Sequence, residues 1–244
     1  MTSTRFDRIC PEPLAAKVPE ITLLFWVIKI LTTAGGEAAS DFLAHNVVVG
    51  AAVEVLIFVV AVVLQFGTRR YFAPAYWFLA YAIAISGTGA ADTMHKQFGV
   101  PYAVSTAFWA VVLVTVFWLW HRSERTLSIH SIVTRRRETF YWVTVFATFA
   151  LGTALGDFTA TALHLGFLAS GIAFAVVIMI PYVGWRFFEL NEVVAFWFAY
   201  VVTRPLGASF ADYASKPHAL SGAALGDGQT PPWPRCSSPS SSPT

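Results

Sequence analysis

Four aspartates recur in this sequence at one fixed distance after a tryptophan. In each copy a Tyr or Phe precedes the Trp, a Gly follows the Trp by ten residues, and an Asp follows it by fifteen. The four sets are Phe25-Trp26, Gly36 and Asp41; Tyr76-Trp77, Gly87 and Asp92; Tyr141-Trp142, Gly152 and Asp157; and Phe196-Trp197, Gly207 and Asp212. Repeats at such spacing indicate one structural unit used four times.

A second oxygen-bearing side chain lies four residues before three of these aspartates. It is Glu37 in the first copy, Thr88 in the second and Thr153 in the third, whereas the fourth copy has Ala208. This spacing places both side chains on one face of a helix. Carboxylate and hydroxyl oxygens suit Mg²⁺, Ca²⁺ or Mn²⁺, and Na⁺ or H⁺ stays open.

These residues predict a site for a cation or for protons. Its expected members are Asp41, Asp92, Asp157, Asp212, Glu37, Thr88 and Thr153, and the four aspartates are the expected ligands if the cation is a metal. The alternative is structural: each Asp hydrogen-bonds to a neighbouring helix, and the repeat reproduces that role four times.

Three further charged residues fall inside the apolar segments. Lys29 and Arg204 are the expected charge-compensating cations, either neutralising the Asp group when no cation is bound or pairing permanently with one carboxylate each. Glu54 is expected to be a counter-ion of Lys29 or Arg204, with a proton relay as the alternative.

The elements that carry these residues are predicted to be membrane-spanning helices. Apolar residues make up 56% of the 244 residues and charged residues only 12%, which excludes an ordinary soluble enzyme. Seven windows are long enough to cross a bilayer, and in lipid such windows form helices. They cover residues 20–43, 47–66, 71–94, 100–120, 138–163, 165–185 and 192–213.

The fold class is therefore all-α, a polytopic bundle of about seven helices built from four parallel two-helix repeats. A segment 1–19 precedes the bundle at 20–213, and a Ser/Pro-rich segment 214–244 follows it. The repeats occupy about 20–66, 71–120, 138–185 and 192–213, so the last one lacks its second helix. Gly36, Gly87, Gly152 and Gly207, each followed four residues later by a small residue, predict close contact between the marked helices.

Basic residues predict the orientation of the bundle. Arg5, Arg8 and Lys17 precede the first window, and most other arginines follow the second, fourth and sixth windows. The positive-inside bias then places the N-terminus in the cytoplasm. The basic loop His121–Arg137 is explained by this topology signal, or alternatively binds anionic lipid head groups or a partner.

Two functions fit these observations. The first is a transporter or channel for a divalent metal, Na⁺ or H⁺ that uses the intramembrane aspartates. The alternative is a structural or regulatory membrane protein that acts through the basic loop. We expect no enzyme, because no nucleophile–base pair or phosphate-binding loop is present, and no nucleic-acid partner. The expected partners are the lipid bilayer and an inorganic cation; no cofactor and no oligomeric state is indicated.

Several segments resemble a family of uncharacterised bacterial inner-membrane proteins described by a tandem repeat of unknown function. The resemblance rests on Lys17–Leu23, Thr32–Glu37, Glu124–Ile132, Thr134–Trp142, Ala195–Trp197 and Thr203–Ser209 and extends from about residue 17 to about residue 228. It implies bacterial origin, the inner membrane and the fourfold repeat, but no activity.

The C-terminal segment departs from the pattern of that family, whose members continue into an eighth apolar helix. Here Gly226-Asp227-Gly228 leads into a stretch rich in Pro and Ser. Such a stretch cannot span a bilayer and is predicted to be disordered, and a frameshifted or truncated terminus is the expected origin.

Overall fold

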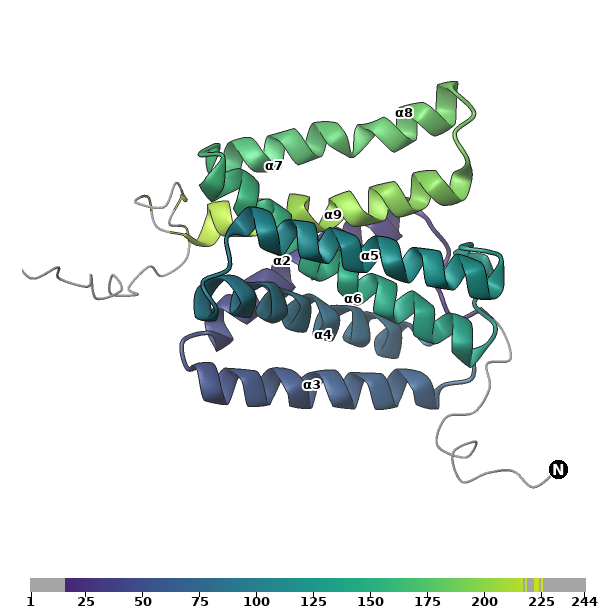
Figure 1. Ribbon diagram of the computed structural model, residues 1–244. Helices are drawn as coiled ribbons and strands as arrows, with labels where there is room; N and C mark the ends of the chain where they lie inside the picture. Colours follow the sequence, from purple (N-terminus) through teal and green to yellow (C-terminus); the bar gives the residue numbers. More distant parts are fainter. Residues whose placement is uncertain (1–15, 217, 219–221, 224, 226–244) are drawn as a thin grey trace, which may run out of the picture.

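The computed structural model describes residues 16–216, 218, 222, 223 and 225, and these residues form an all-helical bundle without strands. The helices, in chain order, are α2 (Leu23–Leu43), α3 (Val47–Gly67), α4 (Ala73–Asp92), α5 (Tyr102–Glu124), α6 (Arg135–Asp157), α7 (Gly166–Val177), α8 (Met179–Phe187) and α9 (Glu192–Ser215). The predicted fold class is confirmed (Figure 1). Most of the predicted segments 1–19 and 214–244 lies outside the described residues, namely 1–15, 217, 219–221, 224 and 226–244.

Local sequence explains where the helices begin. Thr22, Asn46, Thr134 and Asn191 each accept a hydrogen bond from a backbone N–H of the first turn, the usual role of an N-cap. Pro74 lies in the first turn of α4, where its missing N–H costs nothing. α7 and α8 follow one another as a single broken helix, with Pro181 in the second half.

Among the described residues, five helices are long and apolar enough to cross a membrane. They are α3, α5, α6 with its extension to Ala162, the combined α7–α8, and α9. The predicted windows of α2 and α4 form helices of 21 and 20 residues, but α2 carries Lys29, Glu37 and Asp41, and α4 is rich in small residues. Of the seven predicted spans, α2 and α4 are therefore helices that are not among these five candidates.

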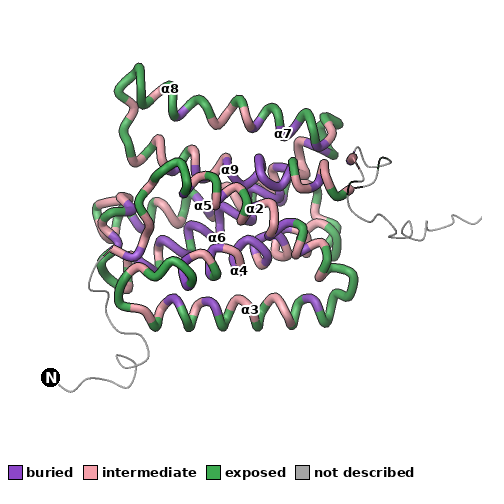
Figure 2. Tube along the Cα trace, turned by 180° about the vertical axis from the view of Figure 1, so that it is seen from behind, coloured by how far each residue is buried: buried purple, intermediate pink, exposed green. Residues whose placement is uncertain are grey.

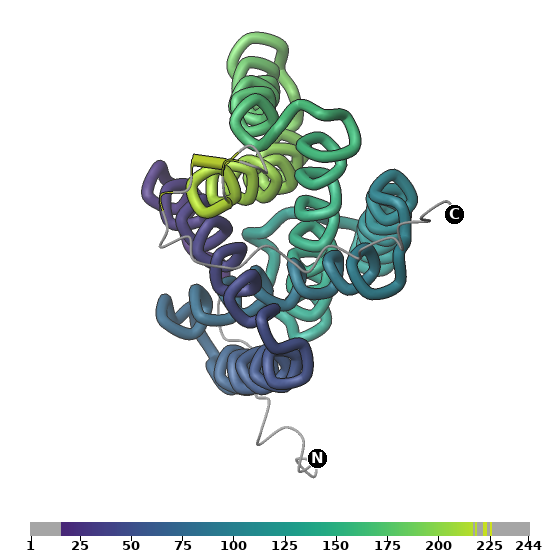
Figure 3. Tube along the Cα trace, turned by 90° about the vertical axis from the view of Figure 1, so that its left-hand side faces the viewer, coloured from purple at the N-terminus to yellow at the C-terminus, as the bar shows by residue number. Residues whose placement is uncertain are grey.

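The helices that carry the repeat form a closed inner ring. α2 contacts α4, α4 contacts α6, α6 contacts α9, and α9 contacts α2. Seen along the bundle in Figure 3, the remaining helices lie outside this ring: α3 packs on α4, α5 on α6, and α7–α8 on α9. Each outer helix thus covers the inner helix of the repeat that follows it.

Burial follows the same division. Buried residues gather on α4, α6 and α9, whereas α3 and α7–α8 are mostly exposed (Figure 2). In a membrane protein the exposed apolar faces of the outer helices contact lipid. The inner ring is therefore the place where polar side chains are held away from both lipid and water.

The two ends of the bundle differ in charge. We call the end with Arg69, Arg70, Arg122 and Arg135–Arg137 the arginine end, and the end with the four repeated aspartates the aspartate end. At the arginine end Lys17, which is 1% exposed, forms an ion pair of 2.6 Å with the buried Glu138. Glu138 also accepts hydrogen bonds from Gln65 and Arg135, so this network fastens the start of the described chain to α3 and α6.

Candidate functional site

The axis of the inner ring is lined by residues spaced four apart along each of its helices. They are Phe25, Lys29, Thr33, Glu37 and Asp41 on α2; Tyr76, Ala80, Ala84, Thr88 and Asp92 on α4; Tyr141, Val145, Phe149, Thr153 and Asp157 on α6; and Phe196, Tyr200, Arg204, Ala208 and Asp212 on α9. Sixteen of these twenty residues are buried, and Asp41, Asp92, Asp157 and Phe196 are partly exposed. The axis thus consists of successive layers with one residue from each repeat.

The repeat glycines lie at the contacts between the inner helices and set these layers in register. A Cβ atom on Gly36 would meet Ala84, one on Gly87 would meet Phe149, one on Gly152 would meet Arg204, and one on Gly207 would meet Thr33. Each of these contact residues lies three positions before the glycine of its own helix. The four inner helices are therefore related by an approximate fourfold rotation, with equivalent residues at the same level.

Aromatic side chains close the axis toward the arginine end. The Tyr76 and Tyr141 hydroxyls are 2.5 Å apart, and the Phe25 and Phe196 ring centroids are 6.4 Å apart. Phe25, Tyr76 and Tyr141 are buried. Their rings fill this layer, and the two tyrosines place hydroxyl groups within it.

Lys29 lies in the next layer, enclosed by rings. It is 3% exposed, and its amine is 3.7 Å from the ring centroid of Tyr200 and 4.4 Å from that of Phe149. The amine has no hydrogen-bond partner among the described residues. The prediction that Lys29 pairs with a carboxylate is wrong, because cation–π contacts surround its nitrogen instead.

Arg204 occupies the centre of the ring, in the layers of the predicted oxygen ligands. Its exposed fraction is 0%, and one terminal nitrogen donates to Glu37 Oε2 at 2.5 Å, to Thr153 Oγ1 at 2.8 Å and to Thr88 Oγ1. The other terminal nitrogen donates to the Thr33 carbonyl at 3.2 Å. Three of the seven predicted oxygen ligands thus converge on one cation, which is the guanidinium of the protein itself.

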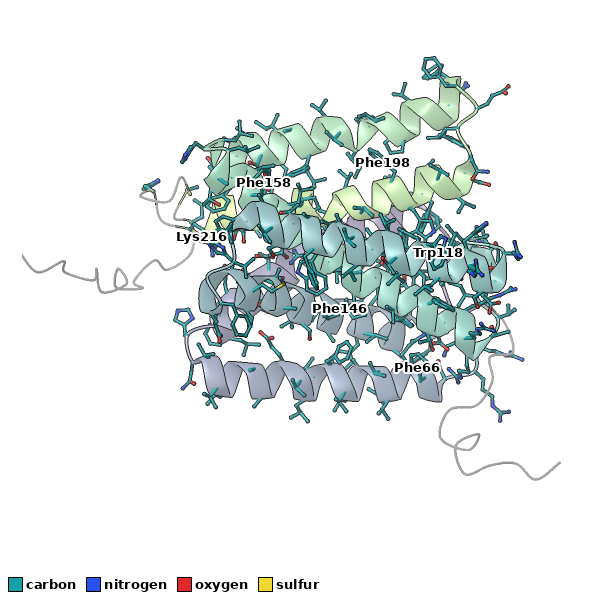
Figure 4. All side chains as sticks on the ribbon, viewed as in Figure 1. Phe66, Trp118, Phe146, Phe158, Phe198 and Lys216 are labelled. Atoms are coloured by element: carbon teal, nitrogen blue, oxygen red, sulfur yellow. The ribbon has the colours of Figure 1, made fainter. Side chains whose placement is uncertain are left out.

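The four aspartates follow at the aspartate end, but their surroundings differ. Lys216, labelled in Figure 4 at the opposite end from Trp118, forms ion pairs with Asp41 and, at 3.5 Å, with Asp212. Lys96 pairs with Asp92 at 2.6 Å. The Asp157 side chain has neither a hydrogen bond nor an ion pair with another described residue. The four carboxylates are therefore unequal, although their helices are equivalent.

The described aspartates are not arranged as a preformed metal site. Among the described residues, no three His, Cys, Asp or Glu side chains are placed to hold one metal ion. Lysine amines take the positions beside Asp41, Asp92 and Asp212 instead. Burial lowers the pKa of the Lys216 amine, but the carboxylates of Asp212 and Asp41 outweigh it and hold this pKa above its ordinary value.

Glu54 lies beside the aspartate end rather than at the axis. It accepts a hydrogen bond of 3.5 Å from Ser40 and lies against Gly89. The predicted pairing of Glu54 with Lys29 or Arg204 is wrong, because Glu37, one turn before Asp41, takes Arg204. Sequence reasoning also missed Lys216, although its position four residues after Asp212 matches that of Lys96 after Asp92.

Asp92 and Asp157 share a backbone feature. Each is followed at once by a π-helical turn, η1 (Thr93–Gln97) after α4 and η3 (Phe158–Ala162) after α6. Both turns end their helices, so the two aspartates lie at equivalent positions where the α-helical hydrogen bonding stops. No sequence signal used above predicts these turns.

Comparison with known families agrees with this arrangement. Residues 24–71, 75–126, 140–191 and 195–230 match the family described as Repeat of Unknown Function (DUF347). The chain belongs to this family. In the first three segments a DUF347 repeat contains one inner helix and the outer helix that follows it, and the fourth contains α9. No curated protein and no solved structure matches the chain, so DUF347 membership confirms the repeat but assigns no activity.

Proposed function

We propose that this multi-pass membrane protein transports small cations, with protons as the species that its axis fits best. The observation that carries the proposal is the axial series of polar groups enclosed by the inner ring: the aspartates, the Glu37–Arg204 pair, Lys29 and the tyrosine hydroxyls. Ionisable groups inside a membrane bundle are costly and usually mark a pathway for ions or protons.

Two groups in this series are suited to exchanging protons. Asp157 has a carboxylate without a partner at the aspartate end, and Lys29 has an amine without a hydrogen-bond partner deeper in the bundle. Arg204 lies between these levels and keeps its charge, whereas a lysine amine can release its proton. We propose Asp157 and Lys29 as proton carriers and Arg204 as the fixed cation that orients Glu37.

The proposal names protons rather than a divalent metal. Glu37, Thr88 and Thr153, the oxygen-bearing side chains that converge, already bind the Arg204 guanidinium. A proton needs a chain of titratable and hydroxyl groups but no set of ligands around one point. By the positive-inside bias, we place the arginine end and the N-terminus on the cytoplasmic side of a bacterial inner membrane, so that protons enter from the aspartate end.

The test is proton flux into liposomes that contain the purified full chain and a pH-sensitive dye, under an imposed membrane potential. We expect flux above that of protein-free liposomes. Asp157→Asn and Lys29→Met should abolish it, and Glu192→Gln, which removes a carboxylate at the start of α9, should not. Lys29→Arg keeps a positive charge but cannot release a proton, so it should also be inactive.

A non-transporting structural or regulatory role is the second candidate, favoured by the lysine pairs of Asp41, Asp92 and Asp212. It predicts no flux in the wild type and a loss of thermal stability when these pairs are removed. If proton flux into liposomes that contain the wild-type chain is no faster than into protein-free liposomes, the transport proposal is overturned and this alternative is supported. Melting temperatures of all variants separate loss of transport from loss of folding.

A further inference from the structure

A surface groove lies between α5 and α6 at the arginine end, outside the inner ring. Its volume is about 380 Å³, and it is lined by Val116, Leu119, Arg136, Thr139, Phe140 and Val143. The Thr139 hydroxyl donates to the Arg135 carbonyl of its own helix, at 2.9 Å. The walls of the groove therefore present almost only carbon atoms, and Arg136 is the one charged residue among those that line it.

Arg136 differs from the two arginines beside it. Arg135 binds the buried Glu138, and Arg137 binds Glu124 and the Ser131 carbonyl. The side chain of Arg136 is 67% exposed, and only its Nε takes part in an ion pair, with Glu124 at 3.3 Å. Its terminal nitrogens donate no hydrogen bond to other described residues. They are therefore available to an outside anion.

The groove follows about two turns of α6. Arg136 and Val143 are seven residues apart on α6, which corresponds to about 10 Å along the helix axis. Trp118 on the adjacent helix is 57% exposed and stacks with Arg122, as expected for a residue at the membrane interface. The apolar part of the groove thus extends from the interface into the hydrocarbon region.

We infer that this groove binds an anionic phospholipid, with an acyl chain along α5 and α6 and the phosphate on Arg136. The argument is charge complementarity at one end and an apolar lining along the rest. The paired donors of a guanidinium match the phosphate oxygens of either lipid class. The preference for an anionic lipid follows from net charge, because the cationic group of a zwitterionic head group offsets its phosphate and weakens the attraction to Arg136. This site is separate from the axis and does not depend on the transport proposal.

The test is native mass spectrometry of the full chain in a neutral detergent, titrated with phosphatidylglycerol or with phosphatidylcholine of the same acyl chains. We expect phosphatidylglycerol to bind more tightly. Arg136→Gln should weaken its binding about fivefold, the factor that corresponds to one basic residue at a membrane surface. Arg186→Gln removes an exposed arginine outside the groove and is the matched control, which should leave binding unchanged.

A second variant tests the apolar part of the site. Val143 is 46% exposed, so Val143→Phe fills the groove without disturbing the core and should weaken binding of both lipids. Equal losses in Arg136→Gln and Arg186→Gln would show diffuse attraction by the basic end and overturn the inference. So would unchanged binding in Val143→Phe, or competition by glycerol phosphate as strong as that by the intact lipid.

Discussion

The most direct test of helix packing in the inner ring is to add a methyl group at Gly87, where α4 packs on α6. A Cβ atom there would lie 2.8 Å from Phe149 Cβ and 3.2 Å from the Ala150 backbone nitrogen. Carbon atoms in contact are normally about 3.5–4.0 Å apart, so the helices must separate by about 1 Å. A gap of that size forfeits about a quarter to a half of each dispersion contact along the interface.

We therefore expect Gly87→Ala to destabilise the protein. Overpacking costs about 1–3 kcal/mol, and the better helix propensity of Ala returns about 1 kcal/mol, which leaves a net loss of up to about 2 kcal/mol. The assay is unfolding in mixed micelles as the fraction of SDS rises, followed by tryptophan fluorescence. Gly67→Ala is the control, because nothing lies within 4 Å of a Cβ atom at that position. If both substitutions shift the unfolding midpoint equally, the inferred backbone contact between α4 and α6 is wrong.

Two further predictions concern the charged residues. Arg204→Met should lower the free energy of unfolding by about 3–5 kcal/mol, because it leaves Glu37 buried without its partner. Adding Glu37→Leu to Arg204→Met should recover most of that loss. If the two substitutions instead give additive losses in the same unfolding assay, the inferred Glu37–Arg204 pair is contradicted. At pH values below 10.5, Lys216→Gln should have a lower melting temperature than the wild type. This difference should shrink as the pH rises toward the elevated pKa of Lys216, because the lysine stabilises the fold only while its amine is protonated. A difference that grows at alkaline pH would refute the assigned ion pairs.

The sequence predicted the helices and the contacts between repeats because both depend on spacing along the chain. Apolar windows fix the helices, and the recurring glycines fix which faces meet. The four-residue spacing of Glu37 and Asp41 likewise placed them on one face. These features require only the geometry of a single helix and the repetition of one unit.

The partners of individual charged residues were not predictable in this way. Arg204 binds residues of α2, α4 and α6, and the choice of Glu37 over the aspartates depends on which layer its side chain reaches across the ring. Lys29 was expected to seek a carboxylate, but aromatic rings from α6 and α9 surround it. Each outcome depends on residues far away in sequence.

The succession of inner helices around a common axis has a consequence for how the repeats diverged. Four identical, separate subunits could form the same ring of helices. Every substitution in their common sequence would then appear four times, and an arginine at the axis would face three other arginines. Joining the copies in one polypeptide lets a single guanidinium at position 204 meet a single carboxylate at position 37. Covalent linkage is thus what allows a nearly symmetric scaffold to hold an asymmetric interior.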